Sequence, residues 1–240
     1  MPLSEIAWRP RSGGLIARIL PSAAAAAESA GPLPEAGQGL FPAEERAIRT
    51  AGPRRRAEFI AGRLCARTAL ARLGVPGGPV LPGPAGQPQW PAGVTGSITH
   101  CPGYRACAVA WTADVTAIGI DAEPDEELPG GLIETLAAGP EQALIRRQAA
   151  AMPAVRWERL IFSAKEAAGK LWYPLTGQWP DWPDLVVSAA TGGTFTVRLP
   201  EAGLGLPSTM TGRWLVRDGL IITAIAWTRP AYGLGSYRAA

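Results

Sequence analysis

The chain contains only two lysines, and they lie five residues apart on either side of a glutamate. They are Lys165 and Lys170, which flank Glu166, whereas the remaining basic side chains apart from one histidine are arginines. A lysine ammonium is a compact charge with movable donors, so it can meet a phosphate oxygen at one point where the planar guanidinium is a poor substitute. The pattern indicates a phosphate-contacting segment, and an ordinary solvated helix face is the alternative.

A pair of acids stands near the middle of the chain. In residues 117–123, period-two alternation sends the apolar side chains to one face of a strand and Asp121 and Glu123 to the other. Two such carboxylates lie about 7 Å apart at the backbone, so their oxygens can converge on one ion. Hard oxygen ligands favour Mg²⁺ or Mn²⁺ over zinc. A DxE pair alone is a weak signal, because acids at a strand end are commonly helix caps or turn formers.

Three arginines form a row on one predicted helix. With 100° per residue, Arg56, Arg63 and Arg67 fall within about 40° of one another on the helix predicted for residues 54–73. Three guanidinium groups in a row can hold a phosphate. The alternative is the charged flank of an ordinary amphipathic helix.

The only histidine follows a connection rich in Pro and Gly. Residues 74–96 read as a loop, and its Gly86-Gln87-Pro88 segment lacks the bulk that would keep backbone away from a ligand. His100 is expected at the junction between this loop and a strand at 104–111, beside the hydroxyl of Thr99, where both could donate to an anion. The alternative is a histidine whose ring nitrogens form hydrogen bonds within the protein and bind no ligand.

The element that must position the lysines is a long helix. Apolar residues recur at three-and-four spacing from 155 to 172, and Glu166 and Lys170 project from the opposite side one turn apart. Further elements are expected as follows: a short strand at 16–20, a low-complexity stretch at 23–27, a helix start at 42–46, a turn and helix from 125, an aromatic and proline-rich loop at 172–184, antiparallel strands at 185–188, 194–199, 213–217 and 220–227, and a frayed tail from 230.

Composition narrows the class of protein. The 240 residues suffice for one large or two small domains, and 47% of them are hydrophobic. A net charge of +3 suggests an anionic small molecule or an acidic partner without requiring nucleic acid. Three cysteines without a CxxC pair favour neither structural zinc nor a disulfide framework, so a reducing cytoplasm is expected. Neither a secretory signal nor a membrane span is predicted, because residues 1–11 lack an apolar core and Pro and Gly interrupt the uncharged run at 73–104.

Three segments in order carry a family resemblance. They are Gly-Ser-Ile-Thr-His-Cys at 96–101, Ile-Gly-Ile-Asp-Ala-Glu at 118–123, and Phe-Ser-Ala-Lys-Glu-Ala at 162–167 with Lys170 following. Together they resemble the 4′-phosphopantetheinyl transferases of the Sfp type, nearest to the enterobactin synthase component D branch. The likeness covers about residues 54–228, and the ordered DxE and KExxxK pair is much more specific than either half.

The resemblance implies an α/β (α+β) fold, a pseudo-dimer of two similar halves with the active site in the cleft between them. We expect an N-terminal half at 1–114, a C-terminal half at 115–228 and a tail at 229–240. It also implies the reaction: a serine of an apo acyl or peptidyl carrier protein attacks the β-phosphate of coenzyme A, and 3′,5′-ADP leaves. Carriers of polyketide, nonribosomal peptide or siderophore synthases are the expected partners, and a monomer suffices.

The family's roles carry over to single positions. Asp121, Glu123 and Glu166 match the acids that bind Mg²⁺ or Mn²⁺, and Glu166 also matches the proposed general base. Lys170 and His100 match the groups that contact the diphosphate.

The match is looser for the groups that would hold the nucleotide. Arg63, with Arg56 as a helper, corresponds to the basic helix at the 3′-phosphate, and the loop at 86–88 to a segment near the adenine. The chain departs from the family pattern in having Gly169 where a tyrosine is common, Gln87 where a basic residue is common, and Ala122 in place of a larger aliphatic residue.

Two rival functions remain. A Mg²⁺-dependent nuclease would also use clustered acids, but it would carry more excess positive charge and stacking aromatic residues along a groove. A non-catalytic module that binds coenzyme A or carrier protein is the other rival. Retention of all three acids and both lysines argues against that module.

Overall fold

A computed structural model describes residues 14–31, 33–34, 39–201 and 205–228. The segment 1–11, in which no secretory signal was recognised, and the tail predicted to fray from residue 230 lie outside these residues. Among the described helices, none combines the length and the apolar character needed to cross a membrane.

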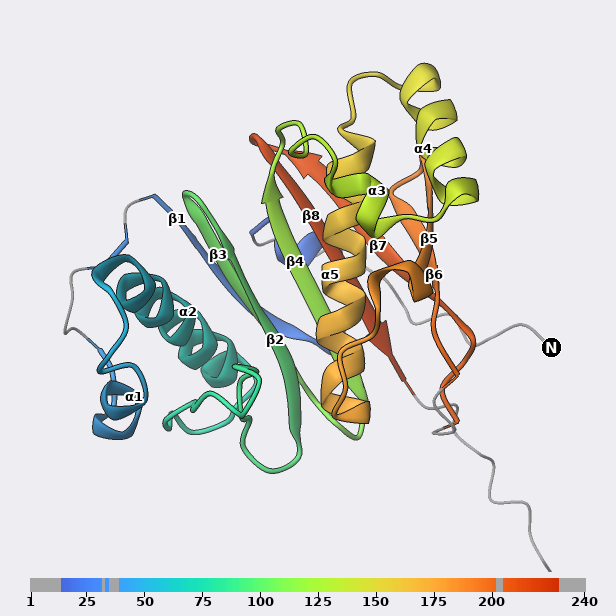
Figure 1. Ribbon diagram of the computed structural model, residues 1–240. Helices are drawn as coiled ribbons and strands as arrows, with labels where there is room; N and C mark the ends of the chain where they lie inside the picture. The colour runs from blue at the N-terminus through green and yellow to red at the C-terminus, as the bar shows by residue number, and fades with distance from the viewer. Residues whose placement is uncertain (1–13, 32, 35–38, 202–204, 229–240) are drawn as a thin grey trace, which may run out of the picture.

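The first half of the chain forms a three-stranded antiparallel sheet with a helix on one face. The strands are β1 (Ala25–Ala30), β2 (Val94–Cys101) and β3 (Tyr104–Trp111), in the order β1-β3-β2. The helix α2 (Pro53–Arg72) covers the sheet, and α1 (Pro42–Ala47) lies beside it (Figure 1). Pro53 opens α2 at a position where a helix has no use for the missing backbone N–H.

The second half forms a five-stranded antiparallel sheet in the order β4-β8-β7-β6-β5. Its strands are β4 (Ala117–Pro124), β5 (Val186–Ala190), β6 (Thr194–Arg198), β7 (Thr209–Arg217) and β8 (Leu220–Trp227). The long helix α5 (Trp157–Thr176) lies across this sheet, and α3 (Leu132–Leu136) and α4 (Gly139–Ala151) pack at one end of it (Figure 1).

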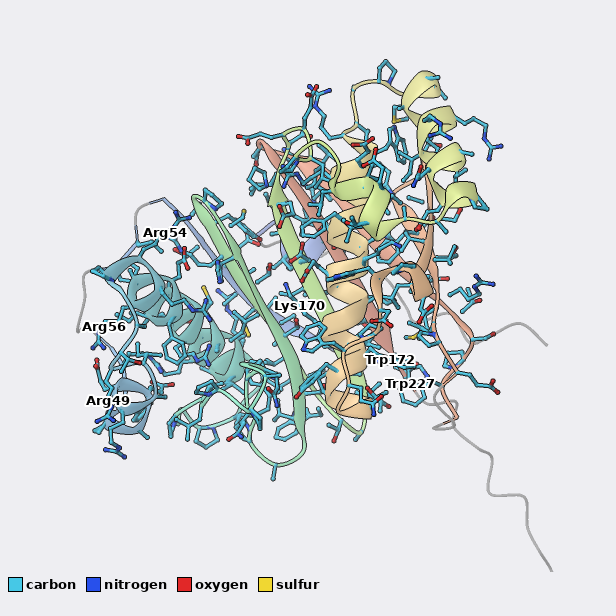
Figure 2. The ribbon with its side chains drawn as sticks, viewed as in Figure 1. Arg49, Arg54, Arg56, Lys170, Trp172 and Trp227 are labelled. Carbon is cyan, nitrogen blue, oxygen red and sulfur yellow. The ribbon has the colours of Figure 1, made fainter. Side chains whose placement is uncertain are left out.

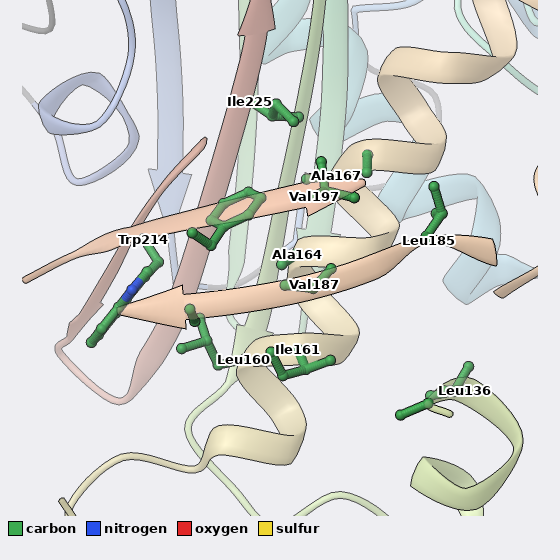
Figure 3. Packing of buried hydrophobic residues seen from close by; sticks show 14 of the residues in the cluster. Leu136, Leu160, Ile161, Ala164, Ala167, Leu185, Val187, Val197, Trp214 and Ile225 are labelled. Atoms are coloured by element: carbon green, nitrogen blue, oxygen red, sulfur yellow. The ribbon is translucent and has the colours of Figure 1, made fainter. Parts of the chain in front are cut away.

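Helix α5 forms because its apolar residues recur on one side, as the sequence predicts. Leu160, Ile161, Ala164 and Leu171 are completely buried in the core shared with the five-stranded sheet. Figure 3 shows the first three of these side chains in one cluster with Val187 of β5 and Val197 of β6. The predicted loop at 172–184 begins later than expected, because Pro174 is accommodated inside the helix and α5 ends at Gly177 in the left-handed conformation.

A shared core unites the two sheets on the faces that lie away from α2 and α5. It consists of alternate residues of β3, β4 and β8, together with part of β1 and the 3-10 turn η1 (Ile16–Arg18). Strands β2 and β4 lie side by side at this junction, where the Ser97 hydroxyl accepts a hydrogen bond from the backbone N–H of Ile120 at 3.2 Å. The architecture is the mixed α/β arrangement expected, with two sheets.

Several predicted elements differ from the observed ones near their ends. Residues 16–18 form a 3-10 turn rather than a strand, and the low-complexity alanines from Ala25 form strand β1, because sheet pairing with β3 overrides their weak local preference. Strand β2 begins at Val94, so His100 lies within a strand and not at its start. After residue 125 the chain bends, and a helix begins only at Leu132. The predicted helix start at 42–46 and the strands of the second sheet are confirmed. Strands β7 and β8 are joined by a turn at Asp218 and Gly219, where both residues have positive φ.

Candidate active site

The site lies where α5 crosses β4. Asp121 and Glu123 project from the face of β4 that looks toward α5, as strand alternation predicts. On the same face, a Cβ built at Gly119 would lie 1.8 Å from the carbonyl oxygen of Ala167, so only glycine permits this approach. The close contact brings the acids of the strand within reach of the polar side of the helix.

Asp121 is held on one side and free on the other. Its Oδ1 accepts hydrogen bonds from Lys170 Nζ at 2.6 Å and from the Thr99 hydroxyl at 3.1 Å. Its Oδ2 is buried and has no hydrogen-bond partner among the described residues. A buried carboxylate oxygen without a donor is unfavourable unless a ligand completes it, so Oδ2 of Asp121 is available to a cation.

The Thr99 hydroxyl forms hydrogen bonds at the junction between β2 and β4. Besides donating to Asp121, its hydroxyl accepts the backbone N–H of Ala122 at 3.0 Å, and the residue is buried. The sequence analysis expects Thr99 to contact the ligand. In the structure strand alternation points Thr99 toward β4 and its neighbour His100 the other way.

Glu166 and Lys170 lie on the polar side of α5, one turn apart, and both are half-buried. Figure 2 shows Lys170 reaching from the helix toward β4. Desolvation lowers the pKa of Lys170, but the charges of Asp121 and Glu166 outweigh it and the net pKa is raised, so the ammonium persists. Desolvation raises the pKa of Glu166, and Asp121 adds to the rise while Lys170 opposes it. A carboxylate with a raised pKa is suited to accept a proton.

Glu123 is bound by an arginine that the sequence reading did not single out. Arg159 Nη1 donates to Glu123 Oε2 at 2.9 Å, and both side chains are largely buried. Desolvation, followed by the charge of Asp121, raises the pKa of Glu123, while Arg159 opposes the rise. Glu123 therefore interacts electrostatically with Asp121 on β4 and forms an ion pair with Arg159 on α5.

The described residues do not include a ready-made cluster of three His, Cys, Asp or Glu side chains around one metal position. Asp121 is turned partly to Lys170, and Glu123 partly to Arg159. The residues nevertheless fit a divalent cation, since Asp121 offers its unpartnered Oδ2 and its charge influences both Glu123 and Glu166. Oxygen donors alone favour Mg²⁺ or Mn²⁺.

His100 lies at the end of β2 next to the N-terminal turn of α2. Arg55 Nη1 approaches its Nε2 at 3.3 Å. Because a guanidinium can only donate, Nε2 must accept and the ring proton is on Nδ1. Partial desolvation is the main cause that lowers the pKa of His100; Glu58 and Asp121 oppose it, whereas Arg55 and Lys170 reinforce it. A guanidinium beside an imidazole that can take up a proton can bind an anion.

The predicted arginine row faces the protein instead of one ligand. Arg56 pairs with Glu45 of α1, and Arg67 pairs with the buried Glu44 at 3.0 Å. These two pairs favour the alternative reading of a structural helix flank, and Arg55 stands at His100 in place of Arg56. In Figure 2, Arg56 lies toward α1 and away from Lys170.

Arg63, the other predicted nucleotide contact, is also drawn inward. It is 6% exposed, donates through Nε to the carbonyl oxygen of Val80 at 2.8 Å and stacks over the Phe59 ring. Burial lowers the pKa of its guanidinium to about 10. Its Nη2 is buried without a hydrogen-bond partner among the described residues, so one donor remains for a ligand.

The loop at 86–88 forms a tight turn. Gly86 has φ of 83°, which requires glycine, and Gly83 N–H donates to the carbonyl oxygen of Gln87 at 2.7 Å. The Gln87 side-chain oxygen accepts the backbone N–H of Ala85 at 3.0 Å, and Pro88 bridges to Pro82. The Gln87 amide therefore stabilises its own turn.

Lys165 does not belong to the polar side of α5. Its side chain is fully buried, and Nζ donates to Glu141 at 2.9 Å and to the carbonyl oxygens of Leu136 and Trp182 at 2.6 and 2.9 Å. The reading that paired both lysines with phosphate is wrong for Lys165, because it lies about 100° around the helix from Glu166.

Gly169 makes room for an aromatic ring from the loop after α5. A Cβ at this position would lie 2.8 Å from the ring of Trp179, which stacks on Tyr173 with centroids 5.3 Å apart. The space where the resemblance leads one to expect a tyrosine thus holds the neighbouring indole.

The residues that sequence reasoning missed are Arg55 and Arg159. Arg55 stands in a run of three arginines, whose different directions could be assigned only once the start of α2 was known. Arg159 lies seven residues before Glu166, and a spacing of two helical turns puts both on one side. That spacing was a usable signal.

Comparisons with known proteins identify the family of this chain. Residues 43–110 match the family model "4'-phosphopantetheinyl transferase N-terminal domain", and residues 117–217 match "4'-phosphopantetheinyl transferase superfamily". The chain is 44% identical to 4'-phosphopantetheinyl transferase Svp of Streptomyces mobaraensis over 90% of this chain and 91% of the relative. It is 40% identical to PptT of Mycobacterium tuberculosis over 89% and 98% of the two chains. Enterobactin synthase component D of Salmonella typhimurium is 31% identical over 75% of each chain, so that branch is similar but less so than Svp.

Proposed function

This chain belongs to the 4′-phosphopantetheinyl transferase family and is an enzyme of that class, and we infer that the site between β4 and α5 is its active centre. Its reaction moves the 4′-phosphopantetheine group from coenzyme A to a serine of an apo carrier protein. The observation that carries the site assignment is the unpartnered, buried Oδ2 of Asp121 beside Lys170 and opposite Glu166.

Asp121, Glu123 and Glu166 would hold Mg²⁺, with Mn²⁺ as a substitute. When bound, the ion would neutralise charge on the diphosphate and on these carboxylates. Lys170 keeps its proton and can donate to a diphosphate oxygen, while His100 and Arg55 offer donors for a phosphate group on the α2 side. The free Nη2 of Arg63 is a further donor for the nucleotide end.

Glu166 is suited to take the proton of the attacking serine. Its pKa is raised, mainly by desolvation, and it lies one turn from Lys170. As the serine oxygen forms its bond to the β-phosphorus, the serine proton passes to Glu166 and the bond to the bridging oxygen breaks. The leaving 3′,5′-ADP keeps the electron pair of that bond, and Lys170 stabilises the charge that develops.

We further propose that the carrier belongs to a siderophore, polyketide or nonribosomal peptide synthase. Arg146 and Arg147 are exposed on α4 and could meet an acidic carrier helix. Replacing both with Glu should raise the KM for the carrier with little change in kcat, whereas Arg198→Glu on β6 should leave both constants unchanged. An unaltered KM would remove α4 from the docking surface. We also propose that the enzyme works as a monomer and in the cytoplasm; three free cysteines fit a reducing compartment.

The decisive experiment is intact-mass analysis of a purified apo carrier after incubation with this protein, coenzyme A and Mg²⁺. We expect a gain of one phosphopantetheine group that disappears with EDTA. Glu166→Gln should lower kcat by about 10²–10⁴-fold while coenzyme A still binds. The matched control Glu158→Gln alters an exposed glutamate of the same helix and should behave as wild type.

Two outcomes would favour the rival functions. Coenzyme A binding without transfer to any carrier, or a fully active Glu166→Gln enzyme, would point to a non-catalytic binding module or to another base. Saturation by DNA or RNA in place of coenzyme A would point to the nuclease.

A further inference from the structure

Arg159 connects a site carboxylate to the turn that follows it. Its three guanidinium nitrogens each donate to a different acceptor: Nη1 to Glu123 Oε2 at 2.9 Å, Nε to the carbonyl oxygen of Glu126 at 3.3 Å, and Nη2 to that of Glu127 at 2.6 Å. The arginine side chain is only 13% exposed. The position of the guanidinium is therefore set from three directions.

The arrangement leaves one oxygen of Glu123 outside this contact. Arg159 engages Oε2 alone, so Oε1 is the atom that can turn toward Asp121 and Glu166. Arg159 also lies on the same side of α5 as Glu166, two helical turns earlier, which places it at the far end of the acid group from Lys170. Each end of the group is thus held by one cation from α5.

We propose that Arg159 is a positioning residue, which fixes the orientation of Glu123 for the metal through the fork of its guanidinium. The inference rests on the proposed function of the site. Partners that orient a metal ligand are typically worth 10–100-fold in metal affinity. A lysine carries the same charge but cannot meet three separated acceptors in one plane, so the geometry and the charge of Arg159 can be separated by experiment.

The test is the affinity for Mn²⁺, measured by electron paramagnetic resonance in the presence of coenzyme A. Arg159→Lys and Arg159→Gln should both weaken Mn²⁺ binding about 10–100-fold, and activity should recover at high Mg²⁺. Arg156→Gln, an exposed arginine at the start of the same helix, is the matched control and should bind Mn²⁺ as wild type does. Thermal melts followed by circular dichroism distinguish a loss of Mn²⁺ affinity from unfolding. If Arg159→Gln does not fold, the Mn²⁺ affinity of Arg159→Lys alone tests the proposal.

Further measurements distinguish positioning from mere structural support. Hydrogen exchange at the backbone amides of residues 125–127 should speed up in Arg159→Lys, because two carbonyl contacts of the turn are lost. In a Glu123→Gln background, Arg159→Lys should weaken Mn²⁺ binding no further, since its effect passes through Glu123.

Three results would overturn the proposal. They are wild-type Mn²⁺ affinity in Arg159→Lys, tighter Mn²⁺ binding in Arg159→Gln, and an undiminished effect of Arg159→Lys in the Glu123→Gln background. The proposed function is judged separately by carrier modification with the wild-type enzyme. If the wild type and the Arg159→Lys variant both modify the carrier and bind Mn²⁺ equally well, the inference about Arg159 is refuted and the proposed function stands.

Discussion

At the scale of single residues, the two lysines of the chain lie in different environments. Lys170 is half-buried and paired with Asp121, whereas Lys165 is fully buried and paired with Glu141. A buried charge needs a partner, and removing one member of such a pair leaves the other uncompensated. The same residue type therefore stabilises the fold at position 165, and we propose that it supports the reaction at position 170.

Lys165→Met should lower the free energy of unfolding by about 3–5 kcal/mol, because it leaves Glu141 charged and unpaired in the interior. Chemical denaturation measures the loss. The double variant Lys165→Met, Glu141→Leu should recover part of it, and Lys170→Met should chiefly lower transfer activity. Equal stability losses for the two lysine variants would contradict this division.

His100 can be followed without interference because it is the only histidine of the chain. Desolvation, reinforced by Arg55 and Lys170, lowers its pKa below that of an ordinary histidine, so it is neutral at pH 7 in the free enzyme. A bound phosphate favours the imidazolium and should raise the pKa. Coenzyme A affinity should then increase as the pH falls through the pKa of the complex.

Nuclear magnetic resonance of ¹³C-labelled histidine measures both pKa values from one signal. A pKa that coenzyme A leaves unchanged would show that the ring does not meet an anion. Arg55→Gln should raise the pKa of His100 in the free enzyme, because it removes a neighbouring positive charge.

At the scale of elements, the spacing between α5 and β4 decides the site. Asp121 and Glu166 come from different elements, and Gly119 lets the strand and helix backbones approach closely enough for their side chains to share one charge environment. Glu166 and Lys170 lie on one side of α5, and Asp121 and Glu123 lie on the facing side of β4.

Gly119→Ala should separate these two elements. The added Cβ would collide with the carbonyl oxygen of Ala167, which is backbone and cannot rotate away. We expect a loss of about 1–3 kcal/mol in the free energy of unfolding, together with weaker Mn²⁺ binding. Gly139→Ala, at the start of α4 where an added Cβ meets nothing within 4 Å, is the control and should be neutral or slightly stabilising. A Gly119→Ala enzyme of unchanged melting temperature would count against the close-approach argument.

At the scale of the whole molecule, the two sheets share the core between β3, β4 and β8. The residues of this core include Ala108 of the first sheet and Ile120 and Ala224 of the second, all fully buried. Neither sheet can cover this face alone, so the predicted halves 1–114 and 115–228 are expected to depend on each other for stability.

Ile120→Ala should therefore destabilise both halves together, by about 2–5 kcal/mol. Hydrogen exchange should show an equal drop in protection for slow amides of β3 and of β8, and calorimetry should keep one transition. Loss of protection confined to β8, or a stably folded 1–114 fragment, would show that the halves are independent.

Much of the site could be predicted from sequence because it depends on short spacings. A strand repeats every two residues and a helix every 3.6, so the shared face of Asp121 and Glu123 and the shared side of Glu166 and Lys170 follow from local geometry. The same reasoning located α5 and the strands of the second sheet. The family resemblance then supplied the function, which the comparisons support.

Only the tertiary structure decided which long side chains meet across elements. Arg55 rather than Arg56 stands at His100, Arg159 binds Glu123, and Lys165 turns inward to Glu141. Arginine and lysine have many rotamers and can reach partners in several directions, so their contacts depend on which charges the fold places nearby. The sequence determined which residues could act, and packing between α2, α5 and the two sheets determined where each one points.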